Sequence, residues 1–274
     1  MAETPPSDVP NPSSTILFDV SQLERAIVDE IAVMPAPPKW PAFNALRHLN
    51  RAWKLRGIDE PMALFRCITA EEEAAVALFL SLKRRRYPAA DRLKHENHAH
   101  KNAVIPFLQA VEHVLSLTKA SHPDSELVFD PDGKPGKLIF RFKLPAPGHP
   151  YGMWVYPRPP LHMKASRGAL DGTAKVEDFR LGVAEILRSS SVTSLLAFVR
   201  DRAELRNKLL YAKSDGFIEV TFDFDRMFGE YKRNVFRILK IYLLIDPYPK
   251  RQLFVEQALQ GFLSALDGLP KATT

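Results

Sequence analysis

The amino-acid sequence predicts a mainly α-helical fold, a helical bundle that carries a small antiparallel β insert (α+β overall). Apolar residues recur every three or four positions over most of the chain, which is the spacing of amphipathic helices. The pattern changes to strict alternation between Leu138 and Leu144, where Leu138, Phe140, Phe142 and Leu144 would share one face of a strand. A hydrophobic fraction of 46% and a charged fraction of 26% are ordinary for a globular protein, so disorder is expected only at the termini.

The N-terminal half of the bundle is expected at residues 21–120, after a disordered, proline-rich tail at residues 1–20. Residues 1–14 hold four prolines and almost no apolar side chains. Ser21 and Glu24 match a capping box, which marks the start of the first helix. A second proline-rich segment, residues 34–41, ends this helix and is expected to be extended. Further helices are expected over about 42–56, 59–86 and 102–119.

The β insert is expected at residues 121–165, and the C-terminal half of the bundle at residues 166–270. Two strands around a turn-rich segment, and a third strand at Met153–Tyr156, predict a small antiparallel element. Helical spacing returns near Lys175 and continues through Ile186. The remaining expected elements are a helix containing Leu195–Leu210 and capped by Ser191 or Thr193, a strand with Ile218, Val220, Phe222 and Phe224, and helices over about 226–245 and 250–266.

Composition narrows the classes of protein. The single cysteine, Cys67, allows no internal disulfide, and the N-terminus has neither the basic nor the apolar region of a secretory signal, so a cytoplasmic protein is expected. No apolar run is long enough for a transmembrane helix, so no membrane partner is expected. Neither a phosphate-binding glycine loop nor a zinc-finger spacing is present, so no small-molecule cofactor and no metal are expected. A net charge of +6 permits a polyanionic partner.

The first candidate site is the segment Arg206-Asn207-Lys208-Leu209-Leu210-Tyr211. Arg206 and Tyr211 lie within about a turn and a half of each other on a helix. The arginine fork matches phosphate oxygens, and Asn207 could orient a nucleophile. The alternative is a solvated basic face of a helix whose leucines are in the core.

The second candidate is the histidine-rich stretch Arg92–His100. In a helix, Asp91, His95 and His98 would share one face, a spacing that zinc sites use, but no second cluster of ligands accompanies them. A turn between helices with polar histidines is the alternative. A further possibility is an acid–base pair of Arg92 and His98.

The third candidate is the run Glu71-Glu72-Glu73. Successive helical residues diverge by about 100°, so at least one of the three must face the interior of the bundle or a partner. We assign Glu72 and Glu73 to a polar core, with solvation on a helix flank as the alternative. Basic residues near the end of the same helix are compatible with RNA binding, namely Arg84, Arg85, Arg86 and, beyond it, Arg92.

The second and third expected helices, ALRHLNRAWKLRG and PMALFRCITAEEEAAVALFLSLKRRRYP, resemble the opening of the AbiV-type abortive-infection family, a branch of the HEPN superfamily. In that family a small apolar run precedes an acidic pair, as Ile68-Thr69-Ala70 precedes Glu72-Glu73 here. The segment Arg206–Tyr211 resembles the HEPN R-N-x-x-x-H signature. The resemblance covers about residues 42–120 and 190–225, and leaves the insert unexplained.

The resemblance implies a helical bundle, often a homodimer, that binds RNA in antiviral defence and in active members cuts it without a metal. Arg206 would bind the scissile phosphate. Tyr211 stands where the signature has histidine, and a phenol is a poor base at neutral pH. The base would then come from elsewhere, for example His98 or His100. Three classes of function stay open: a ribonuclease of phage defence or a toxin system, a non-catalytic module that binds RNA, a nucleotide or a protein, and a helical scaffold whose β insert contacts a protein partner.

Overall fold

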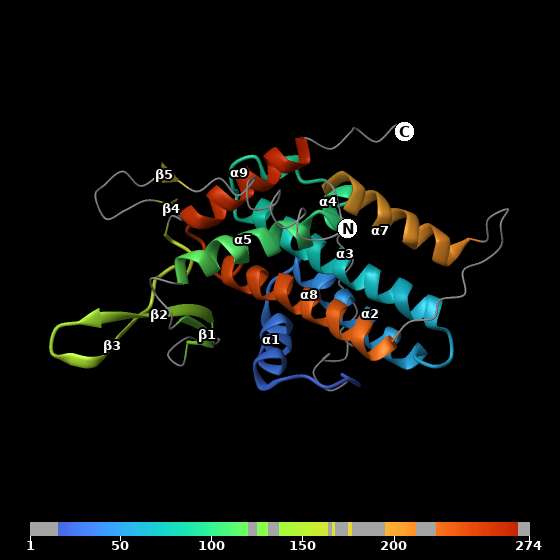
Figure 1. Cartoon of the computed structure of the whole chain (residues 1–274), viewed down its shortest axis with the longest axis horizontal. Coiled ribbons are helices and arrows are strands. Elements are labelled where there is room, and N and C mark those ends of the chain that lie inside the picture. Colours follow the sequence, from blue (N-terminus) through green and yellow to red (C-terminus); the bar gives the residue numbers. More distant parts are fainter. Residues whose placement is uncertain are drawn as a thin grey trace, which may run out of the picture.

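A computed structural model of the chain describes residues 16–119, 125–130, 137–163, 166–167, 175–176, 195–211 and 223–267. The fold is mainly α-helical with a small three-stranded antiparallel sheet, as the sequence predicts. Residues 1–15 of the predicted tail at 1–20, the cap at Ser191 or Thr193, the helical residues Phe179–Ile186 and the strand residues Ile218, Val220 and Phe222 lie outside the described residues. Residues 16–20 of that tail are described, and the prediction of disorder is wrong for them, because the Phe18 ring is buried against Phe228. The sheet lies at one end of the long axis, and the helix that carries Arg206 lies toward the other (Figure 1).

The helices and strands are named in chain order (Figure 1). The N-terminal helices are α1 (Gln22–Val33), α2 (Lys39–Leu55), α3 (Glu60–Arg84), the 3-10 turn η2 (Ala90–Arg92), α4 (His98–Asn102) and α5 (Val104–Lys119). The strands are β1 (Ser125–Phe129), β2 (Leu138–Ala146), β3 (His149–Val155), β4 (Ser166–Arg167) and β5 (Lys175–Val176). The C-terminal helices are α7 (Leu195–Leu210), α8 (Phe224–Ile245) and α9 (Leu253–Asp267).

Side-chain caps fix the N-terminal ends of several helices. The predicted capping box is confirmed: the Ser21 hydroxyl accepts a hydrogen bond from the Glu24 amide, and the Glu24 carboxylate accepts one from the Ser21 amide. The Asp59 carboxylate caps α3 by accepting from the Met62 amide at 3.0 Å. The Asn97 side chain caps α4 in the same way. The last of these caps places His98 at the first turn of a helix.

Some predicted boundaries are wrong. Helix α2 begins at Lys39, inside the segment expected to be extended, because Pro38 and Pro41 fit the N-terminal end of a helix. Lys175 and Val176 form a strand paired with β4 rather than the start of a helix. Phe224, expected in a strand, begins α8, because the Asp223 side chain caps that helix.

Helix α3 lies at the centre of the bundle, where it packs against α2, α8, α7 and α4 (Figure 1). Small side chains along α3 are buried and allow the neighbouring backbones to approach closely; they are Ala63, Ala70, Ala74, Ala75 and Ala77. Larger side chains from α1, α2 and α8 fill the space around them, including Ile27, Leu46, Leu49, Phe236 and Tyr242. The long third helix is therefore the spine of the bundle, as its length predicts.

The three-stranded sheet has the order β1-β2-β3, with β2 in the centre. Leu138, at the start of β2, is fully buried against the helices, and its carbonyl accepts a hydrogen bond from the Tyr248 hydroxyl at 2.9 Å. The other end of the β2–β3 hairpin projects from the body (Figure 1). Gly152 in β3 has a φ of +69°, and a Cβ there would lie 2.8 Å from the Leu144 carbonyl oxygen, so this position requires glycine.

A buried aspartate joins the end of α8 to the end of α3. Asp246 is fully buried, and its carboxylate accepts hydrogen bonds from the Arg84 guanidinium, with Nε at 3.0 Å from Oδ1. The Asp246 carbonyl accepts a further hydrogen bond from Arg85. The two arginines thus satisfy both the buried charge and a carbonyl at the C-terminal end of α8.

We predict that Asp246→Asn lowers the free energy of unfolding by about 3 kcal/mol, because it removes one partner of a buried ion pair. Asp267→Asn is the matched control, since Asp267 pairs with Arg92 at the surface and should contribute less than about 1 kcal/mol. Urea denaturation of the three proteins measures both values. Equal losses in the two variants would contradict this account of Asp246.

Candidate functional site

Two adjacent carboxylates in the middle of α3 are buried. Glu71 and Glu72 are both almost inaccessible to solvent, whereas Glu73 is only partly buried. The placement of Glu72 in a polar core therefore agrees with the structure, and the placement of Glu73 there does not. The second core glutamate is Glu71, because the side of α3 that it occupies is the one covered by α7 and α8.

Glu71 is held by side chains from two helices that are distant in the sequence. Its Oε2 accepts a hydrogen bond from Arg202 of α7, and its Oε1 accepts one from the Asn234 amide of α8 at 2.7 Å. The Arg202 guanidinium also lies over the Tyr231 ring, 5.1 Å from its centroid. Burial raises the pKa of Glu71, while Arg202 and Asn234 oppose that rise. Glu71 thus ties α7 and α8 to α3.

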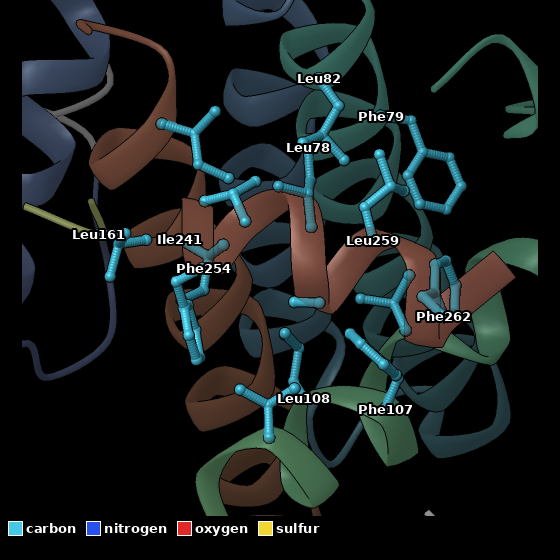
Figure 2. Close-up of a pocket in the computed structure, with 15 residues that line it drawn as sticks. Leu78, Phe79, Leu82, Phe107, Leu108, Leu161, Ile241, Phe254, Leu259 and Phe262 are labelled. Atoms are coloured by element: carbon cyan, nitrogen blue, oxygen red, sulfur yellow. The ribbon is translucent and has the colours of Figure 1, made fainter. Parts of the chain in front are cut away.

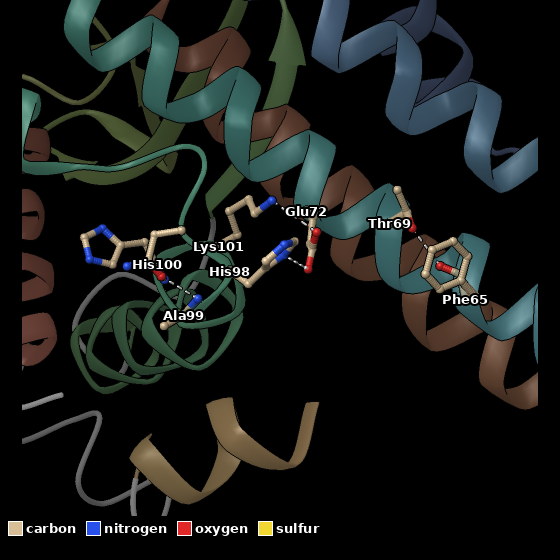
Figure 3. Close-up of polar contacts among 8 residues, drawn as sticks. Phe65, Thr69, Glu72, His98, Ala99, His100 and Lys101 are labelled. Atoms are coloured by element: carbon tan, nitrogen blue, oxygen red, sulfur yellow. Dashed lines mark hydrogen bonds and ion pairs between the residues drawn. The ribbon is translucent and has the colours of Figure 1, made fainter. Parts of the chain in front are cut away.

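Glu72 is held from α4 instead (Figure 3). Its Oε1 lies 2.8 Å from His98 Nδ1, and its Oε2 lies 3.2 Å from Lys101 Nζ. Burial opposes ionisation of Glu72, but the hydrogen bond from His98 and the charge of Lys101 outweigh burial and lower the pKa of the carboxyl group. Glu72 is therefore an ionised group that only accepts hydrogen bonds.

The Glu72–His98 pair has the geometry of a positioned base. Because the carboxylate only accepts, the proton of a neutral His98 ring lies on Nδ1, which leaves the lone pair on Nε2. The His98 side chain is 43% exposed, and Nε2 has no partner among the described residues. A carboxylate that fixes the tautomer and the orientation of a histidine, with the other nitrogen open to solvent, is an arrangement in which the histidine can act as a general base.

Arg206 lies along the same side of α3 as this pair. Its guanidinium lies over the Phe65 ring, 5.5 Å from the centroid, and its Nε is buried without a hydrogen-bond partner in the described part of the chain. Phe65 and Glu72 are seven residues apart, so they lie on one stripe of α3, separated by roughly 10 Å along the axis. Figure 3 shows Phe65, Thr69 and Glu72 along this stripe.

Two other predicted residues of α7 do not join the cluster. Asn207 is exposed, and Tyr211, directly after the helix, is 67% exposed. Tyr211 lies five residues after Arg206, a rotation of about 140° on a helix, so the two side chains leave the helix on different faces. The structure therefore separates Tyr211 from Arg206 and from the buried glutamates.

His100 points away from Glu72 (Figure 3). Its Nδ1 accepts a hydrogen bond from the Lys94 amide at 3.2 Å. Burial and, after it, the charge of Lys94 lower the pKa of the His100 ring. It lines a different hollow, between η2 and the end of α9, together with Arg92, Lys94 and Asp267. Arg92 forms an ion pair with Asp267. The acid–base pair of Arg92 and His98 that the sequence left possible is therefore not present.

Most of the predicted RNA-binding arginines have partners within the protein. Arg84 and Arg85 bind Asp246, and Arg92 binds Asp267, whereas Arg86 is exposed. Arg84 and Arg85, at the end of α3, therefore have a structural role, whether or not they also bind RNA as predicted.

No three histidine, cysteine, aspartate or glutamate side chains gather as a possible metal site among the residues that the structure describes. His95 pairs with Glu96 at 2.9 Å, and His98 pairs with Glu72. Asp91, His95 and His98 therefore do not form the shared helix face that the sequence suggested. Cys67 is buried in α3, and burial raises the pKa of its thiol, which suits an inert core residue.

An apolar cavity of about 70 Å³ lies between α3, α5, α8 and α9 (Figure 2). Its wall includes three phenylalanine rings. The centroid of Phe262 lies 6.2 Å from that of Phe79 and 4.9 Å from that of Phe107. Its lining offers no group that could perform chemistry, so the polar cluster around Glu71 and Glu72 is the candidate site.

The sequence interpretation missed Glu71, Lys101, Arg202 and Asn234. A signal for Arg202 was present, because it lies one turn before Arg206 on the same face of α7. Lys101 lies three residues after His98 and shares its face in the same way. Nothing in the local sequence indicates Asn234, which reaches Glu71 through the packing of α8 on α3.

Comparison of the chain with protein-family models, with curated proteins and with solved structures found no match in any of the three. Across the described helices, none has both the length and the apolar character needed to span a membrane.

Proposed function

We propose that this chain is an RNA-directed module of the HEPN type, acting in the cytoplasm, and that it cleaves RNA without a metal with His98 as the base. The observation that carries the proposal is the contact of 2.8 Å between the buried Glu72 carboxylate and His98 Nδ1, with Nε2 open to solvent. From the resemblance to the abortive-infection family, we further propose that the protein is a homodimer and acts in antiviral defence.

In the proposed reaction, His98 Nε2 takes the proton of a ribose 2′-hydroxyl. The 2′-oxygen attacks the adjacent phosphorus, and the bond to the 5′-oxygen of the next nucleotide breaks. The leaving oxygen takes a proton from the imidazolium, so the products are a 2′,3′-cyclic phosphate and a 5′-hydroxyl end. Ionised Glu72 stabilises the imidazolium between the two proton transfers. DNA lacks the 2′-hydroxyl and would not react.

Arg206 supplies a cation on the same stripe of α3. Its guanidinium has no carboxylate partner in the described part of the chain, in contrast to Arg202, which Glu71 neutralises. At roughly 10 Å from Glu72 along the helix axis, Arg206 is assigned to a phosphate next to the reacting one. Tyr211, which takes the place of the signature histidine, is exposed and lies on a different face of the helix from Arg206, so we assign the role of the base to His98.

We predict that the purified protein cleaves single-stranded RNA in the presence of a chelator, and that His98→Gln lowers the rate by at least about 100-fold, because general-base catalysis contributes 10²–10⁴. RNA binding should persist in this variant. Arg206→Ala should weaken binding about tenfold or more, since a charge-assisted hydrogen bond is lost. Gel analysis of the products and fluorescence anisotropy measure the two effects.

His95→Gln is the matched control, because His95 is a surface histidine of the same segment that pairs with Glu96 instead of a buried group. It should cleave like the wild type. Cleavage that survives His98→Gln, or that is lost equally in His95→Gln, would overturn the assignment of the base. Absence of RNA binding by the wild type would overturn the RNA-directed function itself.

One observation favours the scaffold as a second candidate. On one face of the β2–β3 hairpin, the Arg141 guanidinium lies 4.4 Å from the centroid of Trp154, and Tyr156 beside it is exposed. Met153, on the opposite face, is 52% exposed. Aromatic, methionine and arginine side chains are enriched in protein interfaces. The projecting hairpin could therefore bind a protein partner without any catalysis.

The two functions separate in one experiment. We predict that the double substitution Met153→Ser and Tyr156→Ser leaves RNA cleavage unchanged and the melting temperature little changed, because both side chains are exposed. If the scaffold function holds instead, this variant should lose its activity in cells, while His98→Gln keeps it.

A further inference from the structure

The apolar cavity between α3, α5, α8 and α9 is larger than the gaps that a protein core normally leaves. Its volume is about 70 Å³. A single water molecule needs roughly 10–15 Å³ of such space. Protein cores are otherwise packed as densely as organic crystals, with few voids larger than a water molecule. The cavity therefore has room for a molecule of several heavy atoms.

The walls of this cavity disfavour water. Its lining consists of 15 residues, all with apolar side chains (Figure 2). Within the described part of the chain, none of the buried side-chain polar atoms that lack a partner belongs to the lining. A buried water needs about two to four polar partners, whereas a cavity lined by leucine, isoleucine and phenylalanine stays dry and binds benzene or xenon. An apolar molecule is therefore the occupant that these walls suit.

Contacts at both ends of the lining hold its walls in place (Figure 2). At one end, the Phe254 amide donates a hydrogen bond to the Leu161 carbonyl at 3.2 Å, and the Leu161 amide donates one to the buried Gln252 side chain at 2.6 Å. At the other end, the Phe262 ring packs against two further phenylalanine rings. These contacts oppose collapse of the surrounding side chains into the cavity, so the space is already formed before a ligand binds.

We infer that this cavity is a binding site for a small, uncharged, apolar molecule such as a short hydrocarbon. The volume of about 70 Å³ is half of the roughly 150 Å³ of an engineered apolar cavity that accepts benzene, so the ligand is smaller than benzene. A charged or strongly polar ligand would lose its hydration and find no hydrogen-bonding side chain in return. The lining shares no residue with the polar cluster around Glu71 and Glu72, so the site does not depend on the proposed cleavage of RNA.

Helix α5 forms one wall of the cavity and should respond to a bound ligand. Val104, Phe107 and Leu108, from its first two turns, are part of the lining. A ligand in the cavity gains contacts only while α5 is packed against α3, α8 and α9, because the space between these helices is lost when α5 opens. Binding therefore stabilises the packed position of α5. Hydrogen exchange in α5 should become slower when the cavity is occupied.

The test is a titration of the full chain with xenon and with propane, followed by NMR of the leucine and valine methyl groups. The control is formamide, which has the shape of propane but polar ends. We expect the methyl signals of Leu108 and Leu259 to shift in a saturable way with xenon or propane, and not with formamide at the same concentration. Amide exchange in α5 should slow under the same conditions. The absence of a saturable shift with both apolar probes, or an equal shift with formamide, would overturn the inference.

A substitution that fills the cavity should abolish binding. Ala258 belongs to the lining, so Ala258→Leu should weaken binding of the effective probe about tenfold or more, because the new side chain occupies the space. If the leucine variant does not fold, the smaller Ala258→Val should weaken binding in the same direction. Ser264→Leu is the matched control, since Ser264 is an exposed residue of the same helix, and it should bind like the wild type. Wild-type affinity in a folded Ala258 variant would show that the inference is wrong, whatever the outcome at His98.

Discussion

The burial of two neighbouring carboxylates, Glu71 and Glu72, in the middle of α3 is the constraint on which the rest of the bundle depends. An ionised carboxylate cannot be withdrawn from water without partners, and neighbouring helical residues point about 100° apart. The two groups therefore need partners from different directions. Arg202 and Asn234 supply them for Glu71, and His98 and Lys101 for Glu72.

This requirement determines how the surrounding helices dock. Apolar packing alone tolerates many substitutions and small shifts of one helix along another. A charged hydrogen bond holds only where donor and acceptor meet, so Arg202 fixes the position of α7 along α3, and His98 and Lys101 fix that of α4. The same contacts have a chemical consequence, because the group that satisfies Glu72 is a histidine whose other nitrogen faces solvent. The proposed base, His98, is thus also one of the side chains that stabilise the buried carboxylate of Glu72.

The sequence predicts the parts of the structure that depend on local patterns. The capping box at Ser21, the long helices α3 and α8 and the strand β2 all follow from neighbouring residues, and the structure contains each of them. The candidate site is harder to predict from local sequence patterns. A run of three glutamates shows that one must face inward, but which of Glu71, Glu72 and Glu73 does so depends on where α7 and α4 pack. Likewise, the motif in α7 draws attention to Arg206 and Tyr211, whereas the side chain that reaches a buried carboxylate is Arg202.

The central claim, that each buried carboxylate holds its own neighbouring helices to α3, is tested most directly by hydrogen–deuterium exchange in Glu71→Gln and Glu72→Gln. Glutamine keeps the size of the side chain and removes its charge, so the core stays filled. The account predicts faster exchange in α7 for Glu71→Gln, with α4 little changed, and faster exchange in α4 and the start of α5 for Glu72→Gln, with α7 little changed. Exchange in α7 and α4 that matches the wild type in both variants would contradict it.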